Sequence, residues 1–285
     1  MKLLYISMHR FVRDKDGNLY STGMMGPGYF QRYLSVFDDV TVTGYEVEET
    51  NENSQKKLGA PIRKTEHIKY VLAPCSEWKY ASSFQNRALQ HLIEQEIITT
   101  DAVACKSASG TAVAKRFAQQ YHTPFLVEVV GCPWDAMWNH SLLGKIVAPL
   151  LFVSLRRIVR KSPYVLYVSN EFLQRRYPTT GKTAAISDVE LQPADEEMLE
   201  RRLGSIDRKE KIRIGTAGAL QAAYKGQRFV IEALSRLKAS GRKEFEYHLA
   251  GGGDGSALRR LAEQLGVQDQ VCFDGSLPHE KMFDW

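Results

Sequence analysis

Residues 212–275 constrain the fold most strongly, because they hold two glycine loops in the register of a βαβ unit. The first loop follows an apolar run and contains Gly218, and Lys225 and Gly226 come directly before a helix-forming segment. The second loop follows another apolar run and contains three glycines, Gly251, Gly252 and Gly253. This order of strand, loop and helix, repeated, is typical of parallel strands joined by crossover helices. The sequence therefore predicts an α/β fold for this segment.

The segments after the two loops have the apolar spacing of amphipathic helices. Apolar side chains recur at helical intervals over residues 229–237, and Gly241 supplies the stop. The same spacing recurs over residues 256–265, which end at Gly266. A further short strand is expected at residues 270–273.

The two glycine loops predict an anion site. Loops at the carboxyl ends of parallel strands open onto helix N-termini, whose free amides attract phosphate. Lys225 precedes such a helix, so its ammonium group can reach the same anion as the amides. The alternative is that Lys225 is a solvated surface lysine and that the glycines only make turns. Two loops in one βαβ register favour the phosphate site.

Four short motifs in this segment also carry a family resemblance. In chain order they are Gly218-x-Leu220, Tyr224-Lys225-Gly226, Leu249-Ala250-Gly251-Gly252-Gly253 and Val271-x-Phe273-x-Gly275. Together they resemble the nucleotide-binding half of retaining GT-B glycosyltransferases of the group 1, or family 4, class. The resemblance covers residues 211–285. It implies two Rossmann-like domains and a nucleotide diphosphate sugar as the donor, with no cofactor and no obligatory metal.

Two positions depart from the pattern of the family it resembles. Ala219 stands where many members have an arginine that helps to hold the donor diphosphate. The printed sequence also ends at Trp285, before the position of the Glu, seven residues, Glu motif that grips the ribose and the donor sugar. We therefore expect the C-terminal domain to be incomplete.

Length and composition suit a two-domain protein. The 285 residues divide into an N-terminal Rossmann-like acceptor-side domain (1–188), a charged linker (189–210) and a partial nucleotide-sugar-binding domain (211–285). The net charge of +5 is too small to select a partner, and the basic residues are dispersed, so we expect no nucleic-acid binding. Neither a signal-peptide core nor a membrane-spanning apolar run occurs, and a cytoplasmic protein is expected.

The four cysteines show no metal-binding pattern. Cys75, Cys105, Cys132 and Cys272 are scattered, without the paired spacing of zinc, iron–sulfur or thiol redox sites. We expect reduced, mostly buried thiols and no metal site.

A glycine-rich loop is expected after the first strand. Residues 2–7 form that strand, and the polar segment 9–28 contains Gly23 and Gly26 ahead of a helix at residues 29–37. The resemblance implies that backbone amides of this loop approach the donor phosphates. The alternative is a surface loop without a ligand.

The strand at residues 123–130 leads into a candidate sugar site. It ends at Gly131, and the resemblance implies that this turn faces the donor sugar, although Val130 stands where many members have histidine. Trp134 and Asp135 follow, and an indole face and a carboxylate suit the C–H surface and hydroxyls of a carbohydrate. Asp135 is thus the candidate acceptor-side catalytic residue. The alternative is a buried tryptophan and an N-cap aspartate.

Residues 150–161 have the pattern of a basic amphipathic helix. One interpretation is a surface helix with a solvated edge, and the other is peripheral contact with an anionic membrane, which suits a lipid-linked acceptor. Residues 164–170 are expected to form the last strand of the N-terminal domain.

These features favour a metal-independent glycosyltransferase of surface polysaccharide or glycan synthesis, with this chain inactive on its own. It would move a sugar from a nucleotide diphosphate sugar to a saccharide or lipid-linked acceptor. A non-catalytic truncated relic or regulatory fragment is the alternative, and a sugar-nucleotide epimerase with the same fold is a third.

Overall fold

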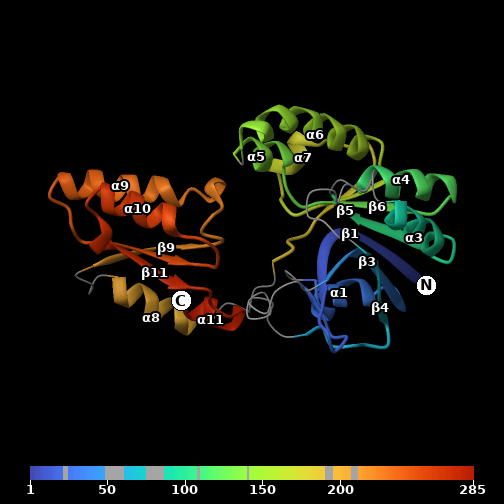
Figure 1. The fold of residues 1–285 in the computed structure, drawn as a ribbon, viewed down its shortest axis with the longest axis horizontal. Helices are drawn as coiled ribbons and strands as arrows, with labels where there is room; N and C mark the ends of the chain where they lie inside the picture. The colour runs from blue at the N-terminus through green and yellow to red at the C-terminus, as the bar shows by residue number, and fades with distance from the viewer. Residues whose placement is uncertain are drawn as a thin grey trace. The chain divides into compact units, whose positions relative to one another are not determined.

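The computed structural model describes residues 1–21, 25–48, 61–74, 87–107, 110–139, 141–189, 195–206 and 211–285. The chain forms two units (Figure 1). Unit 1 comprises Met1–Cys132 and Leu150–Glu190, and unit 2 comprises Pro133–Pro149 and Leu191–Trp285. Gly23, one of the predicted loop glycines, lies outside the described residues.

Unit 1 is built on one predominantly parallel sheet, with strand order β4-β3-β1-β5-β6-β7-β8 and β2 antiparallel to β1. Its strands are β1 (Lys2–Arg13), β2 (Leu19–Ser21), β3 (Asp39–Glu48), β4 (Ile68–Pro74), β5 (Ala102–Lys106), β6 (Phe125–Val129), β7 (Tyr164–Tyr167) and β8 (Lys182–Ala185). Along the chain, β3 and β4 extend the sheet on one side of β1, and the strands from β5 to β8 then extend it on the other side. The switch point between β1 and β5 is where Rossmann-like sheets place their ligands.

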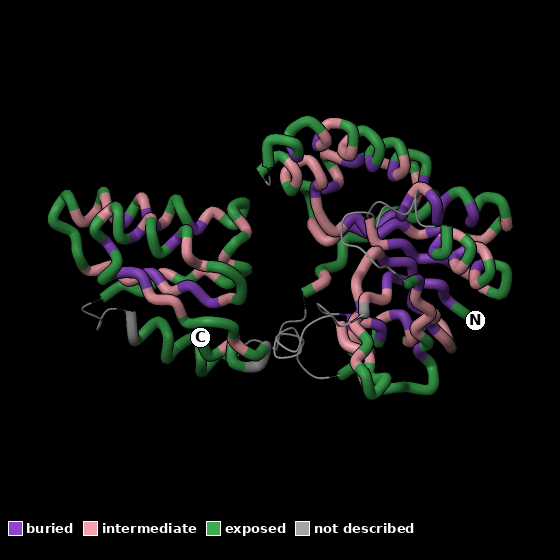
Figure 2. The backbone as a smooth tube through the Cα atoms, in the orientation of Figure 1, coloured by how far each residue is buried: buried purple, intermediate pink, exposed green. Residues whose placement is uncertain are grey.

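Helices connect these strands along the chain, although Pro133–Pro149, which contains the first helix after β6 and the start of the next, belongs to unit 2. The helices are α1 (Pro27–Leu34), α3 (Arg87–Ile97), α4 (Thr111–Gln120), α5 (Pro133–Trp138), α6 (Leu142–Arg160) and α7 (Phe172–Arg176). In the central strand β1, residues 3–6 are all buried, so side chains on both faces of the strand lie in the core. Figure 2 colours the buried residues of this unit purple. Leu3 and Tyr5 pack with Phe30 of α1, while Leu4 and Ile6, which alternate with them, are also fully buried. This confirms the predicted central strand.

The predicted loop at residues 9–28 was wrong over its first half. Strand β1 continues to Arg13, and β2 pairs back onto it as a hairpin. Phe11 is completely buried, which favours the longer strand. The Asp14 carboxylate accepts hydrogen bonds from the amides of Asp16 and Asn18, at 3.0 and 2.7 Å, and closes the turn.

Two further boundaries differ from the sequence prediction. The prediction that residues 164–170 form the last strand of the N-terminal domain was wrong, because β8 follows β7 in the chain and pairs with it in parallel register. The basic helix predicted at residues 150–161 begins earlier, at Leu142, and runs through Pro149 as α6. Packing of its buried face, including Leu155 and Val159, offsets the backbone hydrogen bond that a proline removes.

Unit 2 contains the predicted βαβ segment. Its parallel sheet has the order β11-β10-β9. The elements after α8 (Glu196–Ile206) are β9 (Ile212–Ala217), the 3₁₀ turn η1 (Ala223–Lys225), α9 (Gln227–Ala239), β10 (Phe245–Ala250), α10 (Ser256–Gln264), η2 (Gln268–Gln270), β11 (Val271–Gly275) and α11 (His279–Asp284). Helices α9 and α10 lie side by side on one face of the sheet (Figure 1). On β9, Gly215 contacts the Trp285 indole, since a Cβ there would stand 2.7 Å from it.

We expect Gly251→Ala to destabilise unit 2. A Cβ atom on Gly251 would stand 1.9 Å from the carbonyl oxygen of Gly218, and a backbone atom cannot move aside as a flexible side chain can. Overpacking of this kind costs about 1–3 kcal/mol. Urea unfolding followed by circular dichroism would measure the loss.

Gly252→Ala is the matched control, because the nearest atom to a Cβ there is 4.0 Å away. Its free energy of unfolding should stay within about 0.5 kcal/mol of the wild type. Equal stability of the two variants would contradict the close approach of the loops.

Candidate phosphate site and the carboxyl edge of unit 1

Backbone hydrogen bonds fasten the three loops at the carboxyl edge of the unit 2 sheet. The amide of Gly218 donates to the carbonyl of Ala250 at 2.8 Å, and the amide of Leu220 donates to Gly252 at 3.0 Å. The amide of Gly251 donates to Gly275 at 2.7 Å. The loops after β9, β10 and β11 therefore form one bonded layer, which holds the predicted glycines in fixed positions.

Lys225 lies against the first of these loops. The aliphatic part of its side chain stands 3.6 Å from the position that a Cβ on Gly218 would take. Its ammonium group is 5.5 Å from the centroid of the Tyr224 ring. Lys225 is exposed, and the described residues give it no ion-pair partner. A cation is thus held beside the glycine loop and remains accessible to an anion.

The helix after Lys225 has free amide groups at its start. Gly226 joins η1 to α9 with φ +81°, a left-handed conformation that suits glycine. Helix α9 has no side-chain cap and no acidic residue in its first turn. Buried Gln227 donates its side-chain amide to the carbonyl of Ala219 at 3.2 Å, which fixes the helix start to the loop. The N-terminus of α9 therefore offers unneutralised amides next to Lys225.

The second glycine loop is arranged differently. The Asp254 carboxylate accepts hydrogen bonds from the amide and the hydroxyl of Ser256, at 2.9 and 3.0 Å, at the start of α10. A carboxylate therefore already occupies this helix N-terminus. Beside it, Gly253 has φ +102°. The side chain of Gln221 fills the space where a Cβ of Gly253 would stand. The anion site thus centres on Gly218, Lys225 and Gly226, with the glycines of the second loop along its border. Their role in binding stays a prediction.

The two described glycines that were predicted to line the site in unit 1, Gly26 and Gly131, lie next to the expected helix and strand. Gly26 directly precedes α1, which begins with proline and has no side-chain cap. Gly131 follows β6 in a bend, and nothing lies within 4 Å of a Cβ built on it. Both are compatible with close approach of a ligand, and their function stays a prediction.

Asp135 lies in the first turn of α5 and is half-buried. Its carbonyl accepts a hydrogen bond from the side-chain amide of Asn139 at 2.8 Å. Trp134 does not stand alone, because its ring stacks on that of Trp138 with centroids 5.2 Å apart and planes 10° apart. The acceptor-side role of Asp135 remains a prediction.

A buried carboxylate in unit 1 was not predicted. Glu128 on β6 is 1% exposed, and its Oε2 accepts hydrogen bonds from the hydroxyls of Tyr5 at 2.6 Å and Tyr29 at 3.2 Å. Arg32 lies 3.8 Å from the other oxygen. Burial raises the pKa of Glu128, and the tyrosine hydrogen bonds and Arg32 oppose that shift. The only local signal was a charged residue inside an apolar strand.

Lys106 adds a second cation to this cluster. It ends β5, at the switch point of the sheet, with its ammonium 3.9 Å from Asp188 and 5.2 Å from the Tyr29 ring. Arg32 lies 4.3 Å from the same ring. Burial lowers the pKa of Lys106, although Asp188 opposes the shift. Burial, together with Lys106, also lowers the pKa of His9 to about 4, so that this imidazole is neutral at neutral pH. The carboxyl edge of unit 1 is thus charged and preorganised.

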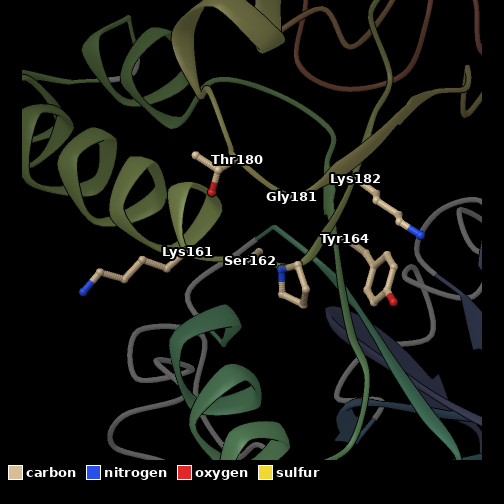
Figure 3. Close-up of a pocket in the computed structure, with 7 residues that line it drawn as sticks. Lys161, Ser162, Tyr164, Thr180, Gly181 and Lys182 are labelled. Carbon is tan, nitrogen blue, oxygen red and sulfur yellow. The ribbon is translucent and has the colours of Figure 1, made fainter.

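One hollow of the structure lies away from these edges. Its volume is 470 Å³, and it lies at the amino ends of β7 and β8, where Tyr164 and Lys182 begin their strands. Lys161 and Lys182 point to opposite sides of it (Figure 3). The two lysines therefore do not converge on a ligand.

The described ranges hold neither a metal-binding cluster nor a membrane-spanning helix. No group of three or more histidine, cysteine, aspartate or glutamate side chains is placed to hold a metal ion among the described residues. No described helix has both the length and the apolar character needed to cross a bilayer.

Known proteins resemble this chain in sequence. Residues 202–283 match the family of glycosyl transferases group 1. Protein CapJ of Staphylococcus aureus is 27% identical, over 97% of this chain and 68% of CapJ. These matches confirm the resemblance predicted from the glycine motifs.

Solved structures share the fold. Anabaena HepE in complex with UDP and glucose matches with a TM-score of 0.58 and 14% identity, over 98% of this chain and 70% of HepE. Sucrose-phosphate synthase from Thermosynechococcus elongatus matches with a TM-score of 0.59 and 14% identity, over 99% and 72%. At these identities the likeness shows the fold, and it confirms the predicted GT-B class.

We expect Glu128→Gln to change how stability depends on pH. The variant keeps an oxygen for Tyr5 and Tyr29 and removes the titration. Because burial raises the pKa of Glu128 above its ordinary value of about 4.3, its ionisation costs folding free energy. That cost is absent at low pH and grows as the pH rises from the unfolded-state pKa through the folded-state pKa. Relative to the wild type, the free energy of unfolding of the variant should therefore increase over this interval.

Urea unfolding between about pH 4 and pH 8 would measure the difference. Glu66→Gln serves as the control, because it makes the same substitution at an exposed glutamate of the same unit. A difference between Glu128→Gln and the wild type that stays constant or falls with pH would contradict the argument.

Proposed function

We propose that this chain, whose residues 202–283 match the group 1 glycosyl transferases, is a retaining glycosyltransferase. It transfers a sugar from a nucleotide diphosphate sugar to a saccharide or lipid-linked acceptor in the synthesis of a surface polysaccharide or glycan. The proposal agrees with two proteins of similar fold, HepE in complex with UDP and glucose and the lipopolysaccharide outer core galactosyltransferase WaaB.

The observation that carries the proposal is Lys225 beside the uncapped start of α9. As the bond between sugar and diphosphate breaks, negative charge grows on the leaving diphosphate. The ammonium of Lys225 and the first amides of α9 stabilise that charge more strongly in the transition state than in the ground state. With Ala219 in place of arginine, Lys225 is the principal cation of this loop. We propose that this stabilisation operates without an obligatory metal ion.

The acceptor side is assigned to unit 1 and to the segment around Asp135. In this proposal the Asp135 carboxylate accepts a hydrogen bond from an acceptor hydroxyl and orients it toward the donor. Gly26 and Gly131 leave space for the donor phosphates or sugar to approach the protein backbone closely. The protein works in the cytoplasm, at the inner face of a membrane when the acceptor is lipid-linked.

We expect Lys225→Ala to weaken the binding of UDP and UDP-sugars at least tenfold, or about 1.4 kcal/mol. Isothermal titration calorimetry of residues 1–285 with UDP, GDP and their sugars would measure it. Lys243→Ala is the matched control, since Lys243 is another exposed lysine of unit 2, and its binding should equal that of the wild type. Undiminished binding of UDP by Lys225→Ala, or an equal loss in both variants, would contradict the assignment of the phosphate site to Lys225.

Transfer is tested separately from binding. Release of UDP or GDP in the presence of saccharide and lipid-linked acceptors would show transfer, and the anomeric configuration of the product by NMR would test retention. Unchanged rates in EDTA would support metal independence. Nucleotide binding without transfer to any acceptor would favour the non-catalytic alternative.

A further inference from the structure

Charged groups at the carboxyl edge of unit 1 have hydrogen-bonding capacity that no described residue uses. Oε2 of Glu128 accepts hydrogen bonds from two tyrosines, whereas Oε1 is buried without a described hydrogen-bond partner. Nε and Nη2 of Arg32 are likewise buried without a hydrogen bond to a described residue. Nη2 lies 3.8 Å from Oε1, an ion-pair distance that is too long for a hydrogen bond. Buried polar groups without partners are rare and cost free energy, so these three atoms favour a further binding partner.

The second ion pair of the cluster is equally loose. The ammonium of Lys106 lies 3.9 Å from the carboxylate of Asp188, again beyond hydrogen-bond distance. The side chains of Arg32, Lys106 and Asp188 are 28%, 27% and 31% exposed, so all three reach solvent. Both cations lie over the ring of Tyr29, whose hydroxyl donates to Glu128. Two incompletely satisfied ion pairs are thus gathered around one aromatic ring.

The place of the cluster in the fold also favours a ligand. Lys106 ends β5, Glu128 lies near the end of β6, and Arg32 comes from α1, which follows β1 and β2 in the chain. These elements meet at the switch point of the sheet, where open parallel sheets bind their ligands. A ligand that enters there from solvent meets the exposed parts of Arg32 and Lys106 first.

The balance of charge in the cluster selects the chemistry of this ligand. Its two cations and two carboxylates offset each other, so an anionic ligand would add repulsion from Glu128 and Asp188. A hydroxyl group both donates and accepts, so one hydroxyl can bond to a carboxylate and a guanidinium at once. Neighbouring hydroxyls of a sugar can repeat this arrangement at the second ion pair. An uncharged polyhydroxylated ligand therefore suits the site better than a phosphate or a carboxylate.

We infer that the cluster of Arg32, Lys106, Glu128 and Asp188 binds the hydroxyl groups of an uncharged saccharide. Arg32 shifts outward and admits one hydroxyl between its guanidinium and Oε1 of Glu128. A neighbouring hydroxyl lies between Lys106 and Asp188. The inference deepens the proposed function, on which it rests for its purpose, because it names an uncharged sugar as the part of the acceptor that unit 1 holds. Binding itself needs no donor.

Saturation-transfer difference NMR of the full chain tests the inference. The probes are the methyl α-pyranosides of glucose, galactose and mannose, and methyl glucuronoside, which carries a carboxylate in addition. At least one neutral glycoside should bind, and the glucuronoside should bind more weakly. Lys106→Met removes the ammonium donors and should weaken binding of the neutral glycoside about tenfold. Lys182→Met is the matched control, because Lys182 is an exposed lysine at the opposite edge of the same sheet, and it should bind like the wild type.

A charge variant provides a second measurement. Asp188→Asn removes one carboxylate and leaves an excess of positive charge, so the glucuronoside should gain affinity relative to the neutral glycoside. Asp101→Asn, at an exposed aspartate directly before β5, should leave this preference unchanged. Thermal melting of each variant would confirm that it folds.

Three outcomes would overturn the inference. They are no binding of any neutral glycoside, equal binding by the cluster variants and their controls, and binding of the glucuronoside by the wild type at least as tight as that of the neutral sugars. The last of these would point to an acidic acceptor.

The two proposals fail separately. If the cluster does not bind saccharide, UDP binding in the calorimeter is unaffected. If Lys225 does not hold the donor, glycoside binding by Lys225→Ala should still equal that of the wild type.

Discussion

The close approach of two backbone segments governs unit 2. The carbonyl of Gly218 lies where a side chain at residue 251 would otherwise stand. Hydrogen bonds tie the Gly218 segment to Ala250 and tie Gly251 to Gly275 at the end of β11. Without a Cβ at this point the loops after β9 and β10 can share one layer. That layer fixes the start of α9 through Gln227 and supports the stem of Lys225. The candidate phosphate site is thus a consequence of backbone packing, with a single cationic side chain added.

In unit 1, side chains and not backbone contacts hold together the elements at the carboxyl edge of the sheet. At its switch point a buried carboxylate is held by two tyrosine hydroxyls, and two cations lie over the ring of Tyr29. The cluster joins β1, α1, β5 and β6, so it links the elements that meet at the carboxyl edge. Burial raises the pKa of Glu128 and lowers that of Lys106, because the charged form of each group loses water. Titratable groups with shifted pKa values often cluster at functional sites, which agrees with the place of this network at the switch point.

Local patterns were sufficient for most of unit 2 and insufficient for parts of unit 1. The helices α9 and α10 and the strand β10 follow from apolar spacing and from the glycines that end them, because those signals lie within each segment. The hairpin of β1 and β2 depends on pairing with β3 and on burial of Phe11, so residues 9–21 read as a loop. The early start of α6 was missed because proline usually ends a helix, whereas Pro149 lies inside one. The hydroxyls that hold Glu128 belong to Tyr5 and Tyr29, which lie 123 and 99 positions away in the chain, so no local pattern reveals the cluster.

The open N-terminus of α9 has a consequence for folding. Its amides carry a partial positive charge that no described carboxylate neutralises, in contrast to α10 with Asp254. An anion that binds there binds only the folded chain, because the unfolded chain has no helix end to offer. By mass action the stability of unit 2 then increases with the logarithm of the free anion concentration above its dissociation constant. The concentration of such an anion would thereby help to determine what fraction of the protein is folded.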